Sequence, residues 1–157
     1  MLKIRIIVVD RTRSAFLREG ESFYLKRLRK YVQADWDEVR PAKMVKGRRD
    51  EEILDAEGEI LSRKLSPKDY VVALDRAGEP LDSEALARWL EHLSRRAPGG
   101  VSFLIGGPLG LSKTLLNRAQ KVLSLSRLTL THEMSRLLLL EQLYRAMTIL
   151  KGEKYHK

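Results

Sequence analysis

The sequence predicts an α/β fold in which helices cover a parallel sheet. Apolar segments of strand length alternate along the chain with longer segments whose apolar residues recur at helical spacing. Residues 70–74 and 101–105 are strongly apolar, as is typical of strands buried on both faces of a parallel sheet. No internal repeat, low-complexity region or long linker interrupts this pattern, so we expect a single domain spanning residues 1–157.

The first half of the chain predicts two strands and two helices. The strands are expected at residues 2–9 and 34–40, and the helices at residues 14–31 and 50–64. Residues 2–9 are rich in β-branched side chains, which favour a strand. The segment between the second strand and the second helix, residues 41–49, is a basic loop that contains glycine. Ser66-Pro67 marks the end of the second helix.

The second half continues the alternation. A strand at residues 70–74 finishes in a tight turn at residues 75–78, and a helix capped by Asp82 or Ser83 runs to about Arg96. A strand at residues 101–105 follows, and the remaining elements are a glycine-rich turn at residues 106–110, a short helix from Ser112 and a brief strand near Val122.

Residues 123–150 combine a polar segment with a strongly apolar helix. In residues 123–130 leucine alternates with serine, arginine or threonine, as in a strand edge or an extended loop. Thr131 is the expected N-cap of the helix. Residues 137–140 are four consecutive leucines that cover about 300° of the helix circumference, so the helix must be buried on more than one side. We expect its own sheet and a second copy of the protein to cover it; the alternative is a core helix enclosed within a monomer.

The charge balance points to a polyanionic partner. The chain has 30 Lys and Arg against 21 Asp and Glu, a formal net charge of +9, and nucleic acid is a better candidate than a membrane surface. Three basic groups stand out: Arg11, Arg13 and Arg18; Lys26, Arg27, Arg29 and Lys30; and Lys43, Lys46, Arg48 and Arg49. Aromatic residues make up only 6% of the chain, which disfavours base stacking as the main mode of recognition.

Composition also bounds the location and the chemistry. The chain has no cysteine, which is compatible with a reducing cytoplasm, and no segment approaches twenty apolar residues, so we expect a soluble cytoplasmic protein without a membrane span. The three histidines, His92, His132 and His156, are far apart in sequence and no thiolate is available, so no metal site is expected.

Residues 106–110 do not form a familiar phosphate-binding motif. Pro108 stands where the dinucleotide pattern GxGxxG requires its second glycine, and two residues separate Gly110 from Lys113-Thr114, which excludes a P-loop and disfavours a nucleotide hydrolase. Glycines after a strand permit close approach of a ligand to the backbone. The segment is therefore either a turn that binds another ligand or merely a turn.

Four sequence segments carry a family resemblance. VVALDRAGEPLDSEALA at residues 71–87, LIGGPLGLS at 104–112, LSLSRLTLTHEMSR at 123–136 and LLEQLYRAMTILKGEKYHK at 139–157 together resemble the RlmH family. This family comprises SPOUT-class methyltransferases that modify a pseudouridine of 23S ribosomal RNA at N3. The resemblance covers essentially the whole chain. One departure is Thr131, where the family usually has proline before the histidine.

The resemblance implies a parallel-sheet SPOUT fold with a deep C-terminal trefoil knot, a homodimer, and S-adenosylmethionine as methyl donor. By motif position the cofactor contacts fall on Leu74, Gly106, Gly107, Leu123, Ser124, Leu125, Ser126, Arg127 and Leu128. Most of these would be backbone contacts to adenine, ribose and methionine. The cation Arg127 is a candidate partner of the cofactor carboxylate or of RNA.

The acceptor nitrogen must lose a proton before it can take a methyl group, so the site needs a base or an anion-stabilising group. Our candidate base is His132, which lies in the first helical turn where the helix dipole favours the neutral imidazole. Arg136, Tyr155 and His156 are candidates to orient or stabilise the pseudouridine. Structural roles for the histidine and a frayed tail at residues 151–157 are the alternatives. A non-catalytic basic RNA-binding or ribosome-associated module remains the rival function.

Overall fold

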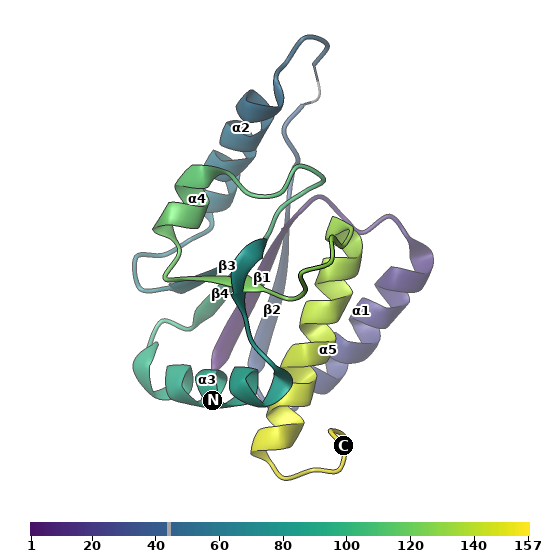
Figure 1. Cartoon of the computed structure of the whole chain (residues 1–157), viewed down its shortest axis with the longest axis vertical. Coiled ribbons are helices and arrows are strands. Elements are labelled where there is room, and N and C mark those ends of the chain that lie inside the picture. The colour runs from purple at the N-terminus through teal and green to yellow at the C-terminus, as the bar shows by residue number, and fades with distance from the viewer. Residues whose placement is uncertain (44) are drawn as a thin grey trace.

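Five parallel strands form one sheet in a computed structural model that describes residues 1–43 and 45–157. The strand order is β2-β1-β4-β3-β5. The strands are β1 Lys3–Val9, β2 Gln33–Val39, β3 Tyr70–Pro80, β4 Val101–Ile105 and β5 Lys121–Ser124. The helices are α1 Ala15–Leu28, α2 Asp50–Arg63, α3 Ser83–Arg96, α4 Lys113–Arg118 and α5 His132–Leu150. The predicted α/β class with a parallel sheet is confirmed (Figure 1).

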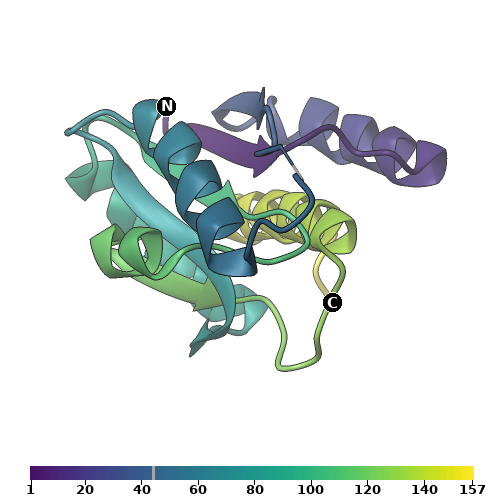
Figure 2. The same ribbon diagram turned by 90° about the horizontal axis from the view of Figure 1, so that it is seen from above.

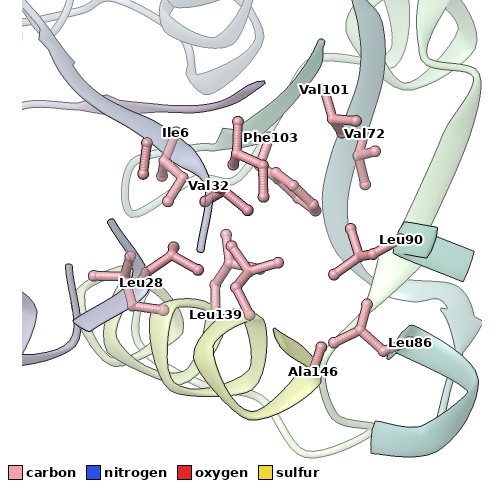
Figure 3. Packing of buried hydrophobic residues seen from close by; sticks show 14 of the residues in the cluster. Ile6, Leu28, Val32, Val72, Leu86, Leu90, Val101, Phe103, Leu139 and Ala146 are labelled. Atoms are coloured by element: carbon pink, nitrogen blue, oxygen red, sulfur yellow. The ribbon is translucent and has the colours of Figure 1, made fainter. Parts of the chain in front are cut away.

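Helices cover the sheet on both faces (Figure 2). Along β1, Ile6 packs into the larger core beside α1, α3 and α5, whereas its neighbour Ile7 packs into the smaller core beside α2 and α4. This alternation follows from the two-residue period of a strand. In the larger core, the side chains of Phe103, Leu90 and Leu139 meet between sheet and helices (Figure 3). Because both faces are covered, β4 is buried along its whole length and the last four residues of β1 are all apolar and buried.

The structure corrects one predicted turn. Residues 75–78, expected as a tight turn, lie within β3. They bulge out of the ladder, since Leu123 of β5 pairs with both Leu74 and Glu79. Gly78 permits the strand to resume, because a Cβ at this position would come within 2.6 Å of the Val122 carbonyl oxygen. The bulge therefore depends on the neighbouring strand, which the local sequence pattern does not report.

Side-chain caps begin three of the helices. The hydroxyl of Thr131 accepts a hydrogen bond from Met134 N at 3.1 Å, which confirms the predicted N-cap of α5. Asp82, one of the two predicted caps of α3, accepts from Ala85 N at 2.7 Å. Each cap satisfies a backbone donor that has no partner within its own helix.

Helix α5 is buried on more than one side, as its leucine run predicts. Leu139 and Leu140 are fully buried, and Leu137 packs on Gly20 of α1. A Cβ on Gly20 would lie 2.9 Å from a Leu137 methyl group, so the glycine permits this close approach of the two helices. Besides the sheet, α1 and α3 of the same chain flank α5. Leu137 and Leu138 remain only partly buried.

The parallel arrangement gives the molecule two distinct ends. All five strands finish at the same edge of the sheet, where α5 begins. Figure 1 shows this edge toward the top, with the start of α5 and the loop before α2, and the C-terminus at the opposite end. Ligands of open α/β sheets bind at the edge formed by the strand carboxyl ends.

Candidate active site

A pocket of about 180 Å³ lies at the carboxyl edge of the sheet. It is formed where β3 and β4 end, between the glycine turn after β4 and the loop that joins β5 to α5. Its lining residues are Leu74, Asp75, Arg76, Ile105, Gly106, Gly107, Pro108, Gly110, Leu125, Ser126, Leu128, Thr129, Leu130, His132 and Ser135. The sequence segments 104–112 and 123–136 therefore converge on one cavity.

The first wall of the pocket is the glycine turn at residues 106–110. Gly106 and Gly107 are buried, and Gly107 forms an isolated antiparallel bridge with Gly110. Gly110 has a φ of 83°, in the region that favours glycine. A Cβ on Gly106 would collide with the backbone carbonyl of Gly110. The turn thus needs glycine at residues 106 and 110 for its own geometry, independently of any ligand.

The second wall is the loop between β5 and α5, which projects from the molecule in Figure 2. Two serine side chains hydrogen-bond to the backbone of this loop. The Ser124 hydroxyl donates to the Ser126 carbonyl at 3.1 Å, and the Ser126 hydroxyl accepts from Leu128 N at 2.9 Å. Leu128 lines the pocket and is nevertheless 76% exposed. A large apolar side chain held in this position can cover a bound ligand.

The structure brings most of the predicted cofactor residues together. Those that line the pocket are Leu74, Gly106, Gly107, Leu125, Ser126 and Leu128. Leu123 and Ser124 do not, because both belong to β5 and are buried within the fold. Arg127 is exposed and is not among the residues that line the pocket. Ser124 still supports the site through its hydrogen bond to the loop.

Sequence reasoning missed several pocket residues. The most notable is Arg76, which was expected only as part of a turn and which donates to the hydroxyl of Thr129, another pocket residue, at 3.2 Å. Ser135 also lines the pocket, one helical turn after His132. Residues three apart on a helix share a face, and this spacing is the signal that identifies Ser135 once His132 is placed.

His132 lines the pocket at the start of α5. Burial, together with the nearby positive charge of Arg136, lowers the pKa of its imidazole below the ordinary value of 6.5. The imidazole is therefore neutral at pH 7 and is able to accept a proton. This is the protonation state that the predicted base requires.

Arg136 lies elsewhere. Its side chain is fully buried, and its guanidinium donates to the Thr12 hydroxyl at 2.9 Å and to the Val9 carbonyl. Thr12 in turn donates to the buried carboxylate of Glu21 at 2.7 Å. Arg136 was predicted to orient or stabilise the pseudouridine, but its side chain turns into the core toward β1 and α1 and does not line the pocket, so it cannot orient the base by contact. It acts on the pocket only through its charge, which affects His132.

The C-terminal tail is ordered against its own chain but far from the pocket. The Tyr155 hydroxyl donates to Glu141 at 3.0 Å, and His156 Nδ1 lies 3.2 Å from Arg145 Nη1. His156 Nε2 is also 3.7 Å from a carboxylate oxygen of Glu84. These contacts lie at the C-terminal end of α5, whose 19 residues span roughly 27 Å. Within one chain, Tyr155 and His156 do not join the pocket.

The described residues contain neither a cluster of metal ligands nor a membrane-spanning helix. Within residues 1–43 and 45–157, the structure has no group of three or more His, Cys, Asp or Glu side chains arranged to hold a metal ion. No helix in the described part of the chain is long and apolar enough to cross a membrane.

Comparison with known proteins identifies a methyltransferase family and a similar solved fold. A family model described as "Predicted SPOUT methyltransferase" matches residues 2–156. A crystal structure of a probable methyltransferase from Bordetella pertussis Tohama I superimposes with a TM-score of 0.55, covering 92% of this chain and 95% of that one. Its sequence identity is 17%, so this likeness supports the fold alone.

Curated relatives match along their whole length. The chain is 39% identical to the ribosomal RNA large subunit methyltransferase H of Halothermothrix orenii, over 99% of this chain and 100% of the relative. Proteins of the same name from Anaeromyxobacter sp. strain Fw109-5 and Desulfotalea psychrophila are 44% and 43% identical, each over 99% of this chain and 100% of their own. The chain therefore belongs to the SPOUT methyltransferase family, in the group of ribosomal RNA large subunit methyltransferases H.

Proposed function

We propose that this methyltransferase transfers a methyl group from S-adenosylmethionine to N3 of a pseudouridine in 23S ribosomal RNA. The observation that carries the proposal is the convergence of the glycine turn, the loop after β5 and His132 on one pocket at the carboxyl edge of a parallel sheet. Full-length relatives are named as methyltransferases of large-subunit ribosomal RNA. The net charge of +9 suits a polyanionic substrate.

The pocket has the chemistry that S-adenosylmethionine requires. Leu74, Ile105 and Leu125 offer apolar contact for an adenine ring, and the two loops expose backbone groups between them. Asp75 and Arg76 supply one negative and one positive side chain for the ammonium and carboxylate of the methionine moiety. When bound, the cofactor supplies an electrophilic methyl group on a sulfonium. We assign these five residues and the glycine turn to holding it.

The role of His132 follows from its location and charge state. The N3–H of a pseudouridine is an imide, whose lone pair becomes available only after the proton leaves. A neutral imidazole in the pocket can accept that proton, and burial keeps His132 neutral. The pocket also holds donor and acceptor in place, which suits a displacement that depends mainly on proximity and alignment.

We further propose that the protein acts as a homodimer. On α1, Phe16 and Phe23 are 71% and 47% exposed, and they flank Gly20, on which Leu137 of α5 packs. These residues at positions i, i+4 and i+7 form one apolar face beside the partly buried leucines of α5. A second copy of the chain would remove this surface from water.

A dimer would also give the C-terminal tail access to a pocket. Tyr155 and His156 lie at the far end of α5 from the pocket of their own chain. If the tail takes part in catalysis, as we predict, it must do so at the pocket of the second copy. The two residues would then orient or stabilise the target base, while each chain binds its own cofactor.

The test is transfer of a labelled methyl group from S-adenosylmethionine to ribosomes that contain or lack the target pseudouridine. Digestion and nucleoside mass spectrometry then identify the product. We expect N3-methylpseudouridine only with the ribosomes that contain the target pseudouridine. Incorporation at another nucleoside would contradict the substrate assignment, and comparison of intact ribosomes with free ribosomal RNA identifies the form of the substrate.

The rival function, a non-catalytic RNA-binding module, is distinguished by cofactor binding. Calorimetric titration with S-adenosylmethionine should give saturable heat with this protein, whereas a pure binding module would give none. Membership of a methyltransferase family favours the enzyme. We place the activity in the cytoplasm, where ribosomes are assembled. From the family resemblance we also propose that the C-terminal segment forms a deep trefoil knot.

A further inference from the structure

The fold sorts the three basic groups of the sequence between the two ends of the molecule. In a parallel sheet, segments that follow a strand begin at the carboxyl edge and segments that precede one end at the amino edge. Arg11 and Arg13 follow β1, and Lys43 and Lys46 follow β2, so both groups begin at the pocket edge. Lys26 and its basic neighbours end α1, just before β2, at the opposite edge.

Strand order places these charges beside the pocket. β1 lies directly between β2 and β4, and the glycine turn of the pocket follows β4. Neighbouring strands are about 4.8 Å apart, so the end of β2 is roughly 10 Å from the end of β4. The basic residues after β2 and β1 therefore form a series that leads toward the pocket.

A buried carboxylate anchors the loop after β2 to the pocket wall. Glu57 of α2, only 6% exposed, accepts a hydrogen bond from Ala42 N at 3.1 Å. Its other carboxylate oxygen lies 3.5 Å from the position that a Cβ on Gly107 would occupy. One buried side chain thus accepts a hydrogen bond from the base of the basic loop and lies beside the glycine turn. Its burial raises the pKa of Glu57.

Several of these cations are available to a ligand. Arg13 is paired with Asp10 at 2.9 Å and Arg49 with Glu52 at 3.0 Å. Across the described residues, by contrast, Arg11, Lys43 and Lys46 have no carboxylate within 4.0 Å, and all three are exposed. Exposed cations without an internal partner are suited to phosphate oxygens.

We propose that Arg11, Lys43 and Lys46, here called the basic strip, bind the phosphate backbone of the ribosomal RNA next to the target nucleotide. This inference rests on the proposed function, since it assigns the RNA contact surface of that same pocket. The basic group at the end of α1 lies at the opposite edge of the sheet of the same chain and is not part of the strip. The strip contributes affinity and register, and the pocket contributes the chemistry.

The test compares two triple variants of the full-length protein that remove the same charge. The strip variant carries Arg11→Gln, Lys43→Gln and Lys46→Gln. The control carries Lys3→Gln, Lys64→Gln and Lys68→Gln, all exposed residues at the amino edge, at the start of β1 and before β3. Methylation of ribosomes, filter binding to ribosomal RNA across a salt series, and calorimetry with S-adenosylmethionine are measured for both.

We expect the strip variant to raise KM for ribosomes at least about tenfold, with kcat within about twofold, and to reduce the salt slope of RNA binding by about two to three. Cofactor affinity should not change, and the control should match the unaltered protein. An unchanged KM in the strip variant, or equal losses in both variants, would overturn the assignment. Failure of the unaltered protein to methylate ribosomes would instead refute the proposed function, and filter binding would still test the strip.

Discussion

The Arg136 guanidinium donates a hydrogen bond to the carbonyl of Val9, which ties the second turn of α5 to the last residue of β1. Its Nη1 also bonds Thr12, which bonds Glu21, so one buried cation joins α5, β1 and α1. Burial lowers the pKa of Arg136 and raises that of Glu21. Arg136 and Glu21 together therefore add less stability than their charges suggest. Removal of either one alone should nevertheless destabilise the fold strongly, because it leaves the other buried without a counter-charge.

Arg136→Met should destabilise the protein by about 3–5 kcal/mol, because it leaves the Glu21 carboxyl buried without its cation and the Val9 carbonyl without its donor. Urea unfolding measures this change. The double variant with Glu21→Gln should recover part of the loss, since it removes the uncompensated carboxylate. A free energy of unfolding unchanged within 0.5 kcal/mol (about the scatter of surface substitutions) would contradict the structural role.

His132 should titrate below its ordinary pKa of 6.5, because burial and the Arg136 charge disfavour the imidazolium. Methylation should therefore fall only as the pH drops through this lowered pKa. His132→Gln should reduce kcat by about 10²-fold or more and abolish that acid limb. Exposed His92 lies outside the pocket, and His92→Gln is the control. A variant at residue 132 that retains the full pH profile would exclude it as the base.

The same shift makes stability depend on pH. His132 has a higher pKa in the unfolded chain than in the folded chain. At a pH between these two values the unfolded chain therefore binds more protons. His132 therefore adds stability above pH 6.5 that is lost as the pH falls through the folded-state pKa. Urea unfolding at several pH values should show this loss, and His132→Gln should reduce it.

The two glycines of the pocket turn should respond differently to alanine. Gly106→Ala would force a Cβ into the Gly110 carbonyl, so the turn must shift and cofactor affinity should fall sharply. At Gly107 the nearest atom, Glu57 Oε1, is 3.5 Å from the Cβ position, an ordinary contact. Gly107→Ala should therefore fold normally. Calorimetry with S-adenosylmethionine measures both; equal affinity of Gly106→Ala and the unaltered protein would refute this account of the turn.

Thr131 stands where the family resemblance leads us to expect proline, and it starts the helix by a hydrogen-bonded cap. Its φ is −62°, compatible with proline, but its hydroxyl caps Met134 N. Thr131→Ala should cost about 1 kcal/mol of stability, because the cap is lost. Thr131→Pro should lose less than alanine, since the ring restricts the unfolded chain. Thermal unfolding of the two variants checks this order, and a larger loss with proline would contradict it.

Deletion of residues 155–157 should abolish methylation while leaving cofactor affinity within a few-fold. The tail contacts Glu141, Arg145 and Glu84 rather than the pocket residues of its own chain, so its loss need not disturb the cofactor site. Activity assays and calorimetry on the shortened protein separate the two effects. Full activity without the tail would rule out its catalytic role.

The sequence by itself determined the features that depend on neighbours along the chain. Strand and helix periodicity, the cap at Thr131 and the glycine turn at Gly106 are local features, so the sequence alone predicts each of them. The sequence also allows several pocket residues, such as Leu74, Leu125 and His132, to be predicted, for a related reason. Leu74 precedes the bulge of β3, Leu125 directly follows β5 and His132 begins α5, and the parallel strands bring these positions to one edge of the sheet.

Only the tertiary structure decided what depends on distant partners. Arg136 meets residues 124 and 127 positions away, so no local pattern reports that its side chain is buried in the core. The extension of β3 beyond Leu74 depends on β5, and the strand order alone places Lys43 near the pocket and Lys26 away from it. Local propensity specifies the elements, whereas the surroundings of each side chain follow from long-range packing, which the periodicity of one chain does not encode.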